Sequence, residues 1–210
     1  MAAKISLKDL EKNVFQKSFQ DGLLDIQIGI MMLTFVLVLY LGPYLGDFWA
    51  STIYLPVYAG IFYGFRILRK KIIQPRIGVV EYGKHRKTRL KKITLVMLII
   101  NILALILGVV AFFYFSTLPG WFISTQLSII ILVGFSLVGY MLEFPRLYMY
   151  GILTATAPII GELLYTRLGV PHHGFPVTFG VAGGLMILCG IIILLRLLKK
   201  YPSSSGEGLE

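Results

Sequence analysis

Charged residues are scarce in this chain of 210 residues: 14% are Asp, Glu, Lys or Arg, whereas 57% are hydrophobic. Soluble domains carry about 25% charged residues, because their surfaces face water. The hydrophobic residues also gather in long blocks instead of spreading along the chain. A soluble globular protein is therefore excluded.

Cysteine and the familiar catalytic motifs are missing as well. One cysteine, Cys189, cannot form an internal disulfide, which excludes a disulfide-stabilised scaffold. The chain contains no HExxH, GxSxG, Walker or GxGxxG pattern. We therefore assign no catalytic residue, metal site or cofactor from the sequence. The sequence is still compatible with an enzyme that has none of these motifs.

Six hydrophobic runs are the main feature that is present. A helix rises about 1.5 Å per residue, so about 20 apolar residues cross the hydrocarbon core of a bilayer. The chain is thus expected to be an all-α integral membrane protein, a bundle of six transmembrane helices within 25–200. The second run is the weakest, since it is short and contains Pro56. The runs are 26–45, 48–65, 93–115, 121–142, 147–166 and 174–195.

The lysines and arginines predict the orientation. Nineteen of the 20 fall in segments on one side of the expected bundle, and only Arg167 falls on the other. Cytoplasmic loops of membrane proteins carry the excess of Lys and Arg. We therefore expect both termini in the cytoplasm and the protein in the cell membrane.

Three segments lie outside the expected helices: 1–24, the loop 66–92 and the polar tail 201–210. Apolar positions in 6–20 recur every three or four residues, which predicts a short amphipathic helix, either in the headgroup layer or docked on the bundle. In the loop, Pro75 is expected to end the preceding helix, and Ile77 to Tyr82 to form a short strand.

The basic loop is expected to contact the bilayer. Basic clusters beside membrane spans attract anionic lipid headgroups. No nucleic-acid-binding module is visible, so we expect no nucleic-acid partner. Asp21 and Asp25 precede the first span, and a basic partner for them is expected within 66–71. The expected lipid-binding residues are Arg69, Lys70, Lys71, Lys84, Arg86, Lys87, Arg89, Lys91 and Lys92.

Small residues four positions apart indicate close helix packing. Gly60/Gly64, Gly151/Ala155, Ala157/Gly161 and Gly180/Gly184 would each lie on one helix face. They favour a compact bundle, as a monomer or as a homodimer.

Polar residues within the spans mark the candidate site. The residues Thr154, Pro158, Glu162 and Tyr165 share one face of the fifth expected helix, and Asn101 lies in the third. Polar groups in the hydrocarbon core are costly, so they usually face the bundle interior and often serve function. Pro158 also frees the carbonyl group of Thr154 from the helical hydrogen-bond pattern.

Three interpretations of Glu162 stay open. It could orient the helix by pairing with Arg167, His172 or His173. It could change charge along a proton- or cation-coupled path. It could bind a metal with both histidines, although adjacent histidine side chains diverge and chelate poorly.

These observations leave three classes of function. The first is a small-solute or ion transporter or channel, with the kinked fifth helix lining the path. The second is a non-catalytic membrane or lipid-binding accessory protein. The third is a lipid-modifying enzyme in which Glu162 and His173 act as acid and base, which requires the two side chains to lie close together.

Overall fold

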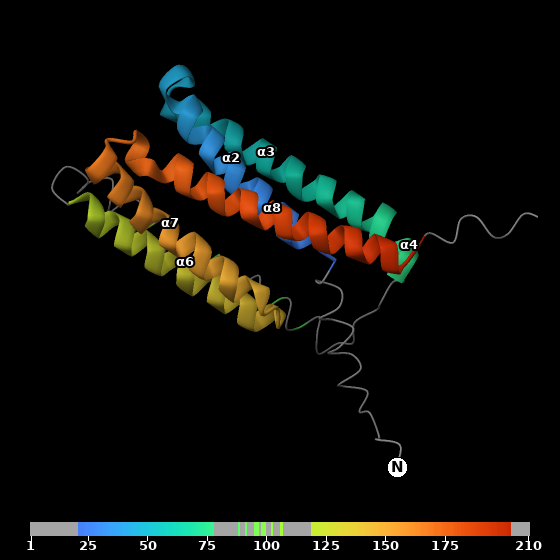
Figure 1. The fold of residues 1–210 in the computed structure, drawn as a ribbon. Coiled ribbons are helices and arrows are strands. Elements are labelled where there is room, and N and C mark those ends of the chain that lie inside the picture. Colours follow the sequence, from blue (N-terminus) through green and yellow to red (C-terminus); the bar gives the residue numbers. More distant parts are fainter. Residues whose placement is uncertain are drawn as a thin grey trace, which may run out of the picture. The chain divides into compact units, whose positions relative to one another are not determined.

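The computed structural model describes residues 21–77 and 119–202, and eight single positions between them (88, 91, 95, 96, 98, 99, 102 and 106). All regular secondary structure in this part of the chain is helical (Figure 1). The helices are α2 Leu23–Leu45, α3 Asp47–Leu68, the π-helical turn η1 Arg69–Ile73, α4 Gln74–Ile77, α6 Gly120–Leu142, α7 Arg146–Leu168, the 3-10 turn η2 His172–Gly174 and α8 Phe175–Lys200.

Four of these helices are long and apolar enough to cross a membrane: α2, α6, α7 and η2 with α8 as one helical stretch. They coincide with four of the six expected spans, and they indicate a membrane-embedded protein. Helix α3 has 22 residues but is not among the four, since three tyrosines, Ser51 and Thr52 dilute its apolar residues. The expected span 93–115 and the amphipathic helix 6–20 lie largely or wholly outside the described residues.

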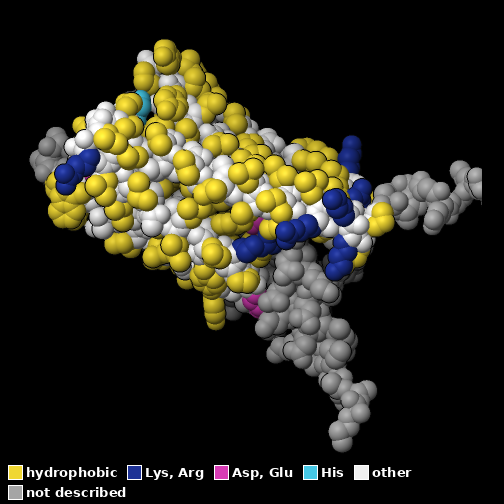
Figure 2. All heavy atoms as spheres, viewed as in Figure 1, with side chains coloured by type: hydrophobic (Ala, Val, Ile, Leu, Met, Phe, Trp, Pro, Cys, Tyr) yellow, Lys and Arg dark blue, Asp and Glu magenta, His cyan; other side chains and the backbone are white. Residues whose placement is uncertain are grey.

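The surface of the helices agrees with a lipid environment. Figure 2 shows hydrophobic side chains over most of the visible face, with Lys and Arg near helix ends. Large apolar side chains such as Leu37, Phe62, Ile129 and Leu188 are exposed. In water such a surface would be costly, whereas hydrocarbon accommodates it.

The chain divides into two compact units, 1–81 with 183–210, and 82–182. The boundary falls within α8, so this helix contributes its first residues to the second unit and the remainder to the first. Each unit has its own packing.

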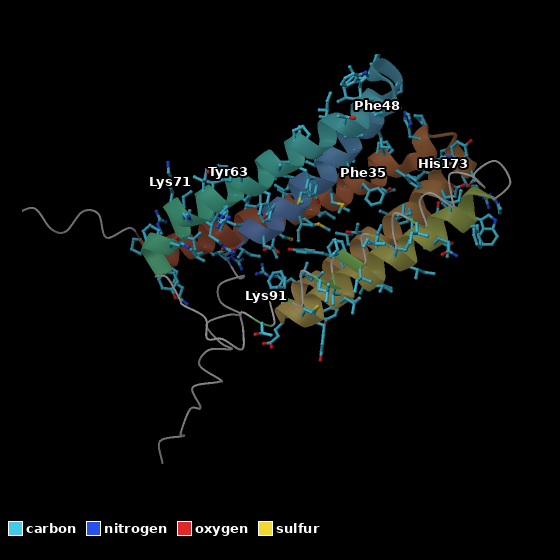
Figure 3. The ribbon with its side chains drawn as sticks, turned by 180° about the vertical axis from the view of Figure 1, so that it is seen from behind. Phe35, Phe48, Tyr63, Lys71, Lys91 and His173 are labelled. Atoms are coloured by element: carbon cyan, nitrogen blue, oxygen red, sulfur yellow. The ribbon has the colours of Figure 1, made fainter. Side chains whose placement is uncertain are left out.

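In the first unit, α2 and α3 form a hairpin that reverses at Gly46. The N–H group of Gly46 donates to the carbonyl oxygen of Gly42 at 2.8 Å, and Gly46 has a φ of 79°, which glycine adopts without strain. Phe48 lies at this turn and Lys71 at the other end of the hairpin (Figure 3).

An ion pair closes that other end. The Nη2 and Nε atoms of Arg69 donate to Oδ2 of Asp21 at 2.7 and 3.0 Å, and Oδ1 of Asp21 accepts the N–H group of Leu23. Asp21 is fully buried, so its charge depends on these partners. The prediction that a basic residue from 66–71 would pair here is confirmed for Asp21.

Glycines allow α2 to pack directly on the part of α8 from Gly183 onward. A methyl group added at Gly29 would lie 2.6 Å from the carbonyl oxygen of Gly183, and one added at Gly190 would lie 2.7 Å from that of Gly22. Gly22 and Gly29 are seven residues apart, and so are Gly183 and Gly190. Each of these two pairs therefore lies on one face of its helix. Backbone therefore meets backbone along this contact.

The prediction that Pro75 ends the helix is wrong. Helix α3 continues through the π-turn η1 into α4, which includes Pro75 and Ile77. The N–H group of Gln74 bonds to the carbonyl oxygen of Arg69, five residues back, which shifts the hydrogen-bond pattern just before the proline. Pro75 then occupies a first helical turn, where its missing N–H group costs little. The predicted strand does not begin at Ile77, because Ile77 belongs to helix α4. The remaining positions of that predicted strand, 78–82, lie outside the described residues.

The second unit contains the antiparallel pair α6 and α7. The chain reverses at Glu143, which has a φ of 54°, and the N–H group of Phe144 donates to the carbonyl oxygen of Gly139. Phe144 and Leu147 are buried at this turn. Half of the residues in the apolar stretch of α7 are buried, whereas only 17% of those in the apolar stretch of α6 are buried. Helix α7 is therefore the central helix of this unit.

Candidate functional site

The polar face of α7 points into the second unit. Thr154, Pro158 and Glu162 follow one another at intervals of four residues and all three are buried. Glu162 is only 7% exposed, although it lies near the end of its helix. An acidic side chain in this position needs compensating partners, because an isolated buried charge is strongly unfavourable.

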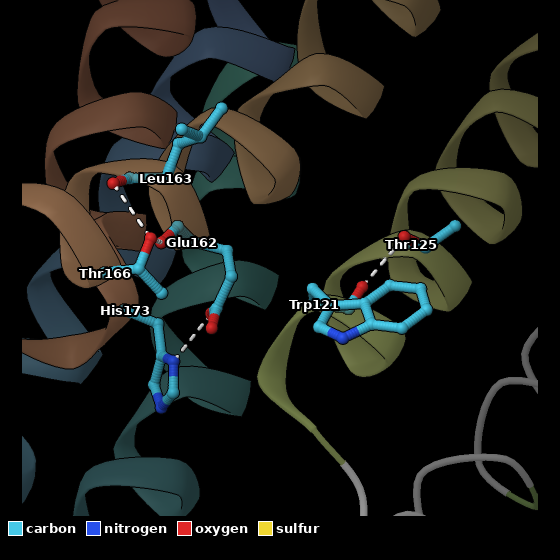
Figure 4. A network of polar contacts seen from close by, with 6 residues as sticks. All are labelled: Trp121, Thr125, Glu162, Leu163, Thr166 and His173. Carbon is cyan, nitrogen blue, oxygen red and sulfur yellow. Dashed lines mark hydrogen bonds and ion pairs between the residues drawn. The ribbon is translucent and has the colours of Figure 1, made fainter.

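A left-handed turn brings the partner of Glu162 into place. Helix α7 ends at Leu168 with Gly169 as its C-cap, and the three residues His172, His173 and Gly174 then have φ values between 52° and 63°. Histidine visits this region only at a cost in free energy, so two successive histidines there mark a strained turn. The turn directs Nδ1 of His173 to within 2.8 Å of Oε2 of Glu162 (Figure 4).

Aromatic rings hold the imidazole of His173. The ring of Tyr165 lies 4.3 Å from it, and the ring of Phe175 lies 5.9 Å away on α8. About one third of the His173 side chain remains exposed. The imidazole therefore connects the buried carboxylate with the surroundings of the protein.

The start of α6 supports the carboxylate from the other side. A methyl group added at Gly120 would overlap Oε1 of Glu162, so the carboxylate lies against the α-carbon of this glycine. Helix α6 has no side-chain cap and no acidic residue in its first turn. The N-terminal end of a helix carries a partial positive charge that favours a nearby carboxylate. Glu162 supplies that negative charge from α7.

A small cavity adjoins the pair. Its volume is about 30 Å³, and its lining includes Gly120, Ser124, Glu162 and His173. The Oγ atom of Ser124 is buried without a hydrogen-bond partner among the described residues. A buried hydroxyl group left unpaired costs free energy. The cavity is large enough for one water molecule, which would satisfy it.

The other predicted residues lie apart from this pair. Thr154 is on the same face two turns away, and its hydroxyl group also has no partner among the described residues. Tyr165 is 43% exposed, so it contacts His173 without being buried on the polar face. Asn101 lies outside the described residues.

Four of the expected lipid-binding residues lie among the described residues. Arg69 is engaged by Asp21, whereas Lys70 and Lys71 are exposed in η1. Lys91 is helical and exposed; the predicted Lys84, Arg86, Lys87, Arg89 and Lys92 fall outside the described residues.

The structure selects among the three interpretations of Glu162 only in part. Of the proposed partners, His173 makes the contact. No group of three or more His, Cys, Asp or Glu side chains that could hold a metal occurs among the described residues. The pair itself offers two ligands.

Sequence reasoning missed Gly120 and Ser124. Gly120 is the first residue of α6, and Ser124 and Ser128 follow it at intervals of four residues on the same face, so the spacing alone could have marked this face. Their proximity to Glu162 depends on how α6 packs on α7.

Comparison of the chain with models of protein families, with curated proteins and with solved structures finds no match.

Proposed function

We propose that this protein moves a proton, or a small solute coupled to a proton, across the cell membrane. The Glu162–His173 pair takes up and releases the proton. The observation that carries the proposal is the 2.8 Å contact between a buried carboxylate and a partly exposed imidazole, beside a water-sized cavity that Ser124 also lines.

Histidine suits this role because its charge changes within the physiological pH range. When His173 is neutral, its Nδ1–H group donates to Glu162; when it gains a proton, the pair becomes a salt bridge. A proton arriving from the surroundings reaches the exposed imidazole first, and the carboxylate next. The proton thus moves from an exposed group to a buried one.

Deeper polar groups extend the path. Ser124 lines the cavity on α6, and Thr154 lies two turns further along α7. Pro158, between Thr154 and Glu162, cannot donate a backbone hydrogen bond to the carbonyl group of Thr154. Water molecules at these unpaired groups would give a proton successive binding sites through α6 and α7.

The orientation belongs to the proposal. In the first unit, the basic residues of η1 and the last residues of α8, Lys199 and Lys200, would face the cytoplasm under the positive-inside rule, with both termini there. Arg167 is the only Lys or Arg of the connection around the pair. Glu162 and His173 would then lie near the outer face.

An acid–base enzyme is less well supported. The contact between Glu162 and His173 satisfies the distance that proton transfer requires. A cavity of about 30 Å³, however, has room for a water molecule and none for a lipid substrate. Small-molecule sites usually measure several hundred Å³.

Flux measurements in proteoliposomes test the proposal. The substitution Glu162→Gln preserves the shape of the side chain and removes its charge. We expect it to lower proton-coupled flux about tenfold or more, because a positioned acid or base contributes about 10²–10⁴-fold to proton-transfer rates. The flux is measured with an entrapped pH dye. Gradients of protons, Na⁺, K⁺, Cl⁻ and small neutral solutes are imposed in turn.

Glu143→Gln is the matched control, because Glu143 is the acidic residue at the opposite end of α6. It should leave the flux unchanged, and both variants should keep the wild-type circular dichroism spectrum. Equal flux for wild type and Glu162→Gln would contradict the proposal. So would a wild-type protein that moves none of these solutes faster than protein-free vesicles.

A further inference from the structure

A groove lies between α2 and α3 in the first unit. It has a volume of about 320 Å³ and is formed by the first turns of α2 and the last turns of α3. This volume lies at the lower end of the range found for small-molecule sites. The groove shares no residue with the Glu162–His173 site.

The walls of the groove change character along its length. Leu24, Phe62 and Phe65 make an apolar surface, and Arg66 and Arg69 follow at the end where the apolar sequence of α3 stops. An apolar channel that ends at guanidinium groups matches a molecule with a hydrocarbon chain and an anionic head.

The two arginines are not equivalent. Asp21 neutralises Arg69 through two hydrogen bonds, and its carboxylate is buried. The side chain of Arg66 is exposed and makes no hydrogen bond or ion pair with any described residue. Lys70 and Lys71 directly follow Arg69 in the chain, and both are also exposed. The charge presented at the groove is therefore positive, and Arg66 is the group available to an anion.

We infer that this groove binds an anionic phospholipid. Its phosphate group bonds to Arg66, and the upper part of one acyl chain lies against Phe62 and Phe65. A guanidinium group suits this contact, because it binds phosphate oxygens in a bidentate manner. Under the proposed orientation the lipid belongs to the cytoplasmic leaflet, where anionic lipids attract basic segments.

Native mass spectrometry of the full chain in detergent tests the inference. Dioleoyl phosphatidylglycerol and dioleoyl phosphatidylcholine are added separately, and the bound fraction is measured for each. We expect the wild type to prefer the anionic lipid, and Arg66→Gln to lower its affinity about fivefold, since each basic residue near anionic lipid contributes about this factor. Arg66→Lys should retain most of the affinity.

Two further variants separate the groove from general charge. Arg196→Gln removes an exposed arginine of α8 that does not line the groove, and it should leave binding unchanged. Leu24→Trp fills the apolar part, and it should weaken binding of both lipids.

The outcomes that overturn the inference are distinct. Unchanged phosphatidylglycerol binding by Arg66→Gln or by Leu24→Trp, or an equal loss in Arg196→Gln, would each do so. Displacement of the lipid by millimolar inorganic phosphate would show that the ligand is a soluble anion. None of these results bears on the flux test of Glu162.

Discussion

At the scale of single residues, the candidate site depends on Glu162 and His173, whose roles are set by the residues around them. Glu162 could be selected from the sequence, because an acidic residue within an apolar run is unusual and expensive. Its partner could only be narrowed to Arg167, His172 or His173. The choice of His173 follows from three successive left-handed residues after Pro171, and hydrophobic periodicity does not encode such a turn.

Gly120 offers a test of this arrangement. In Gly120→Ala the new methyl group overlaps a carboxylate oxygen of Glu162, a flexible group that can move away. Moving it lengthens the bond to His173, and hydrogen bonds to charged groups contribute about 1.5–3 kcal/mol. We expect a loss of about 1–3 kcal/mol in the free energy of unfolding, measured by denaturation in detergent, and a changed imidazole signal of His173 by NMR.

Gly134→Ala in the same helix is the control, since a methyl group there meets nothing within 4 Å. Alanine is the better helix former by about 1 kcal/mol, so this variant should be as stable as the wild type or more so. A Gly120→Ala protein that behaves like Gly134→Ala would show that the carboxylate does not lie where we describe it.

At the scale of elements, the apolar runs predicted four helices to within a few residues, and they could do so because a span must be about 20 apolar residues long. The contacts between helices were harder to predict. The pairs Gly60/Gly64 and Gly180/Gly184 leave open space, whereas Gly29 and Gly183 meet backbone to backbone. The spacing of small residues shows which helix faces permit close approach of another helix. Many faces permit it, but only some of them pack against a neighbouring helix. The π-turn before Pro75 likewise has no signature that periodicity detects.

Two adjacent glycines of α8 test the packing of α2 on α8. Gly183→Ala places a methyl group 2.9 Å from the carbonyl oxygen of Gly29 and 3.1 Å from Cβ of Met32. Overpacking of this kind costs about 1–3 kcal/mol, so thermal unfolding in detergent should shift to lower temperature.

Gly184→Ala adds the same methyl group one position along, where nothing lies within 4 Å. It should unfold at the wild-type temperature or above it. If both variants unfolded alike, the proposed contact between α2 and α8 would be wrong.

At the scale of the whole molecule, the arrangement of apolar helices requires the bilayer as its solvent. Few charges, four described helices with the length and hydropathy of spans, and large exposed apolar side chains all agree with it. The sequence predicts two more spans, 48–65 and 93–115, and an even number is what places both termini on one side. The proposed Glu162–His173 path and the proposed lipid site both take their direction from that topology.

Cysteine labelling in intact cells tests this topology most directly. Cys189 is replaced by serine, and single cysteines are placed at Gly169, beside the candidate site, and at Lys87, in the basic loop. A membrane-impermeant maleimide should label position 169 in intact cells and position 87 only after permeabilisation. Labelling of position 87 from outside, or of neither position until the membrane is opened, would contradict six spans with a cytoplasmic basic loop.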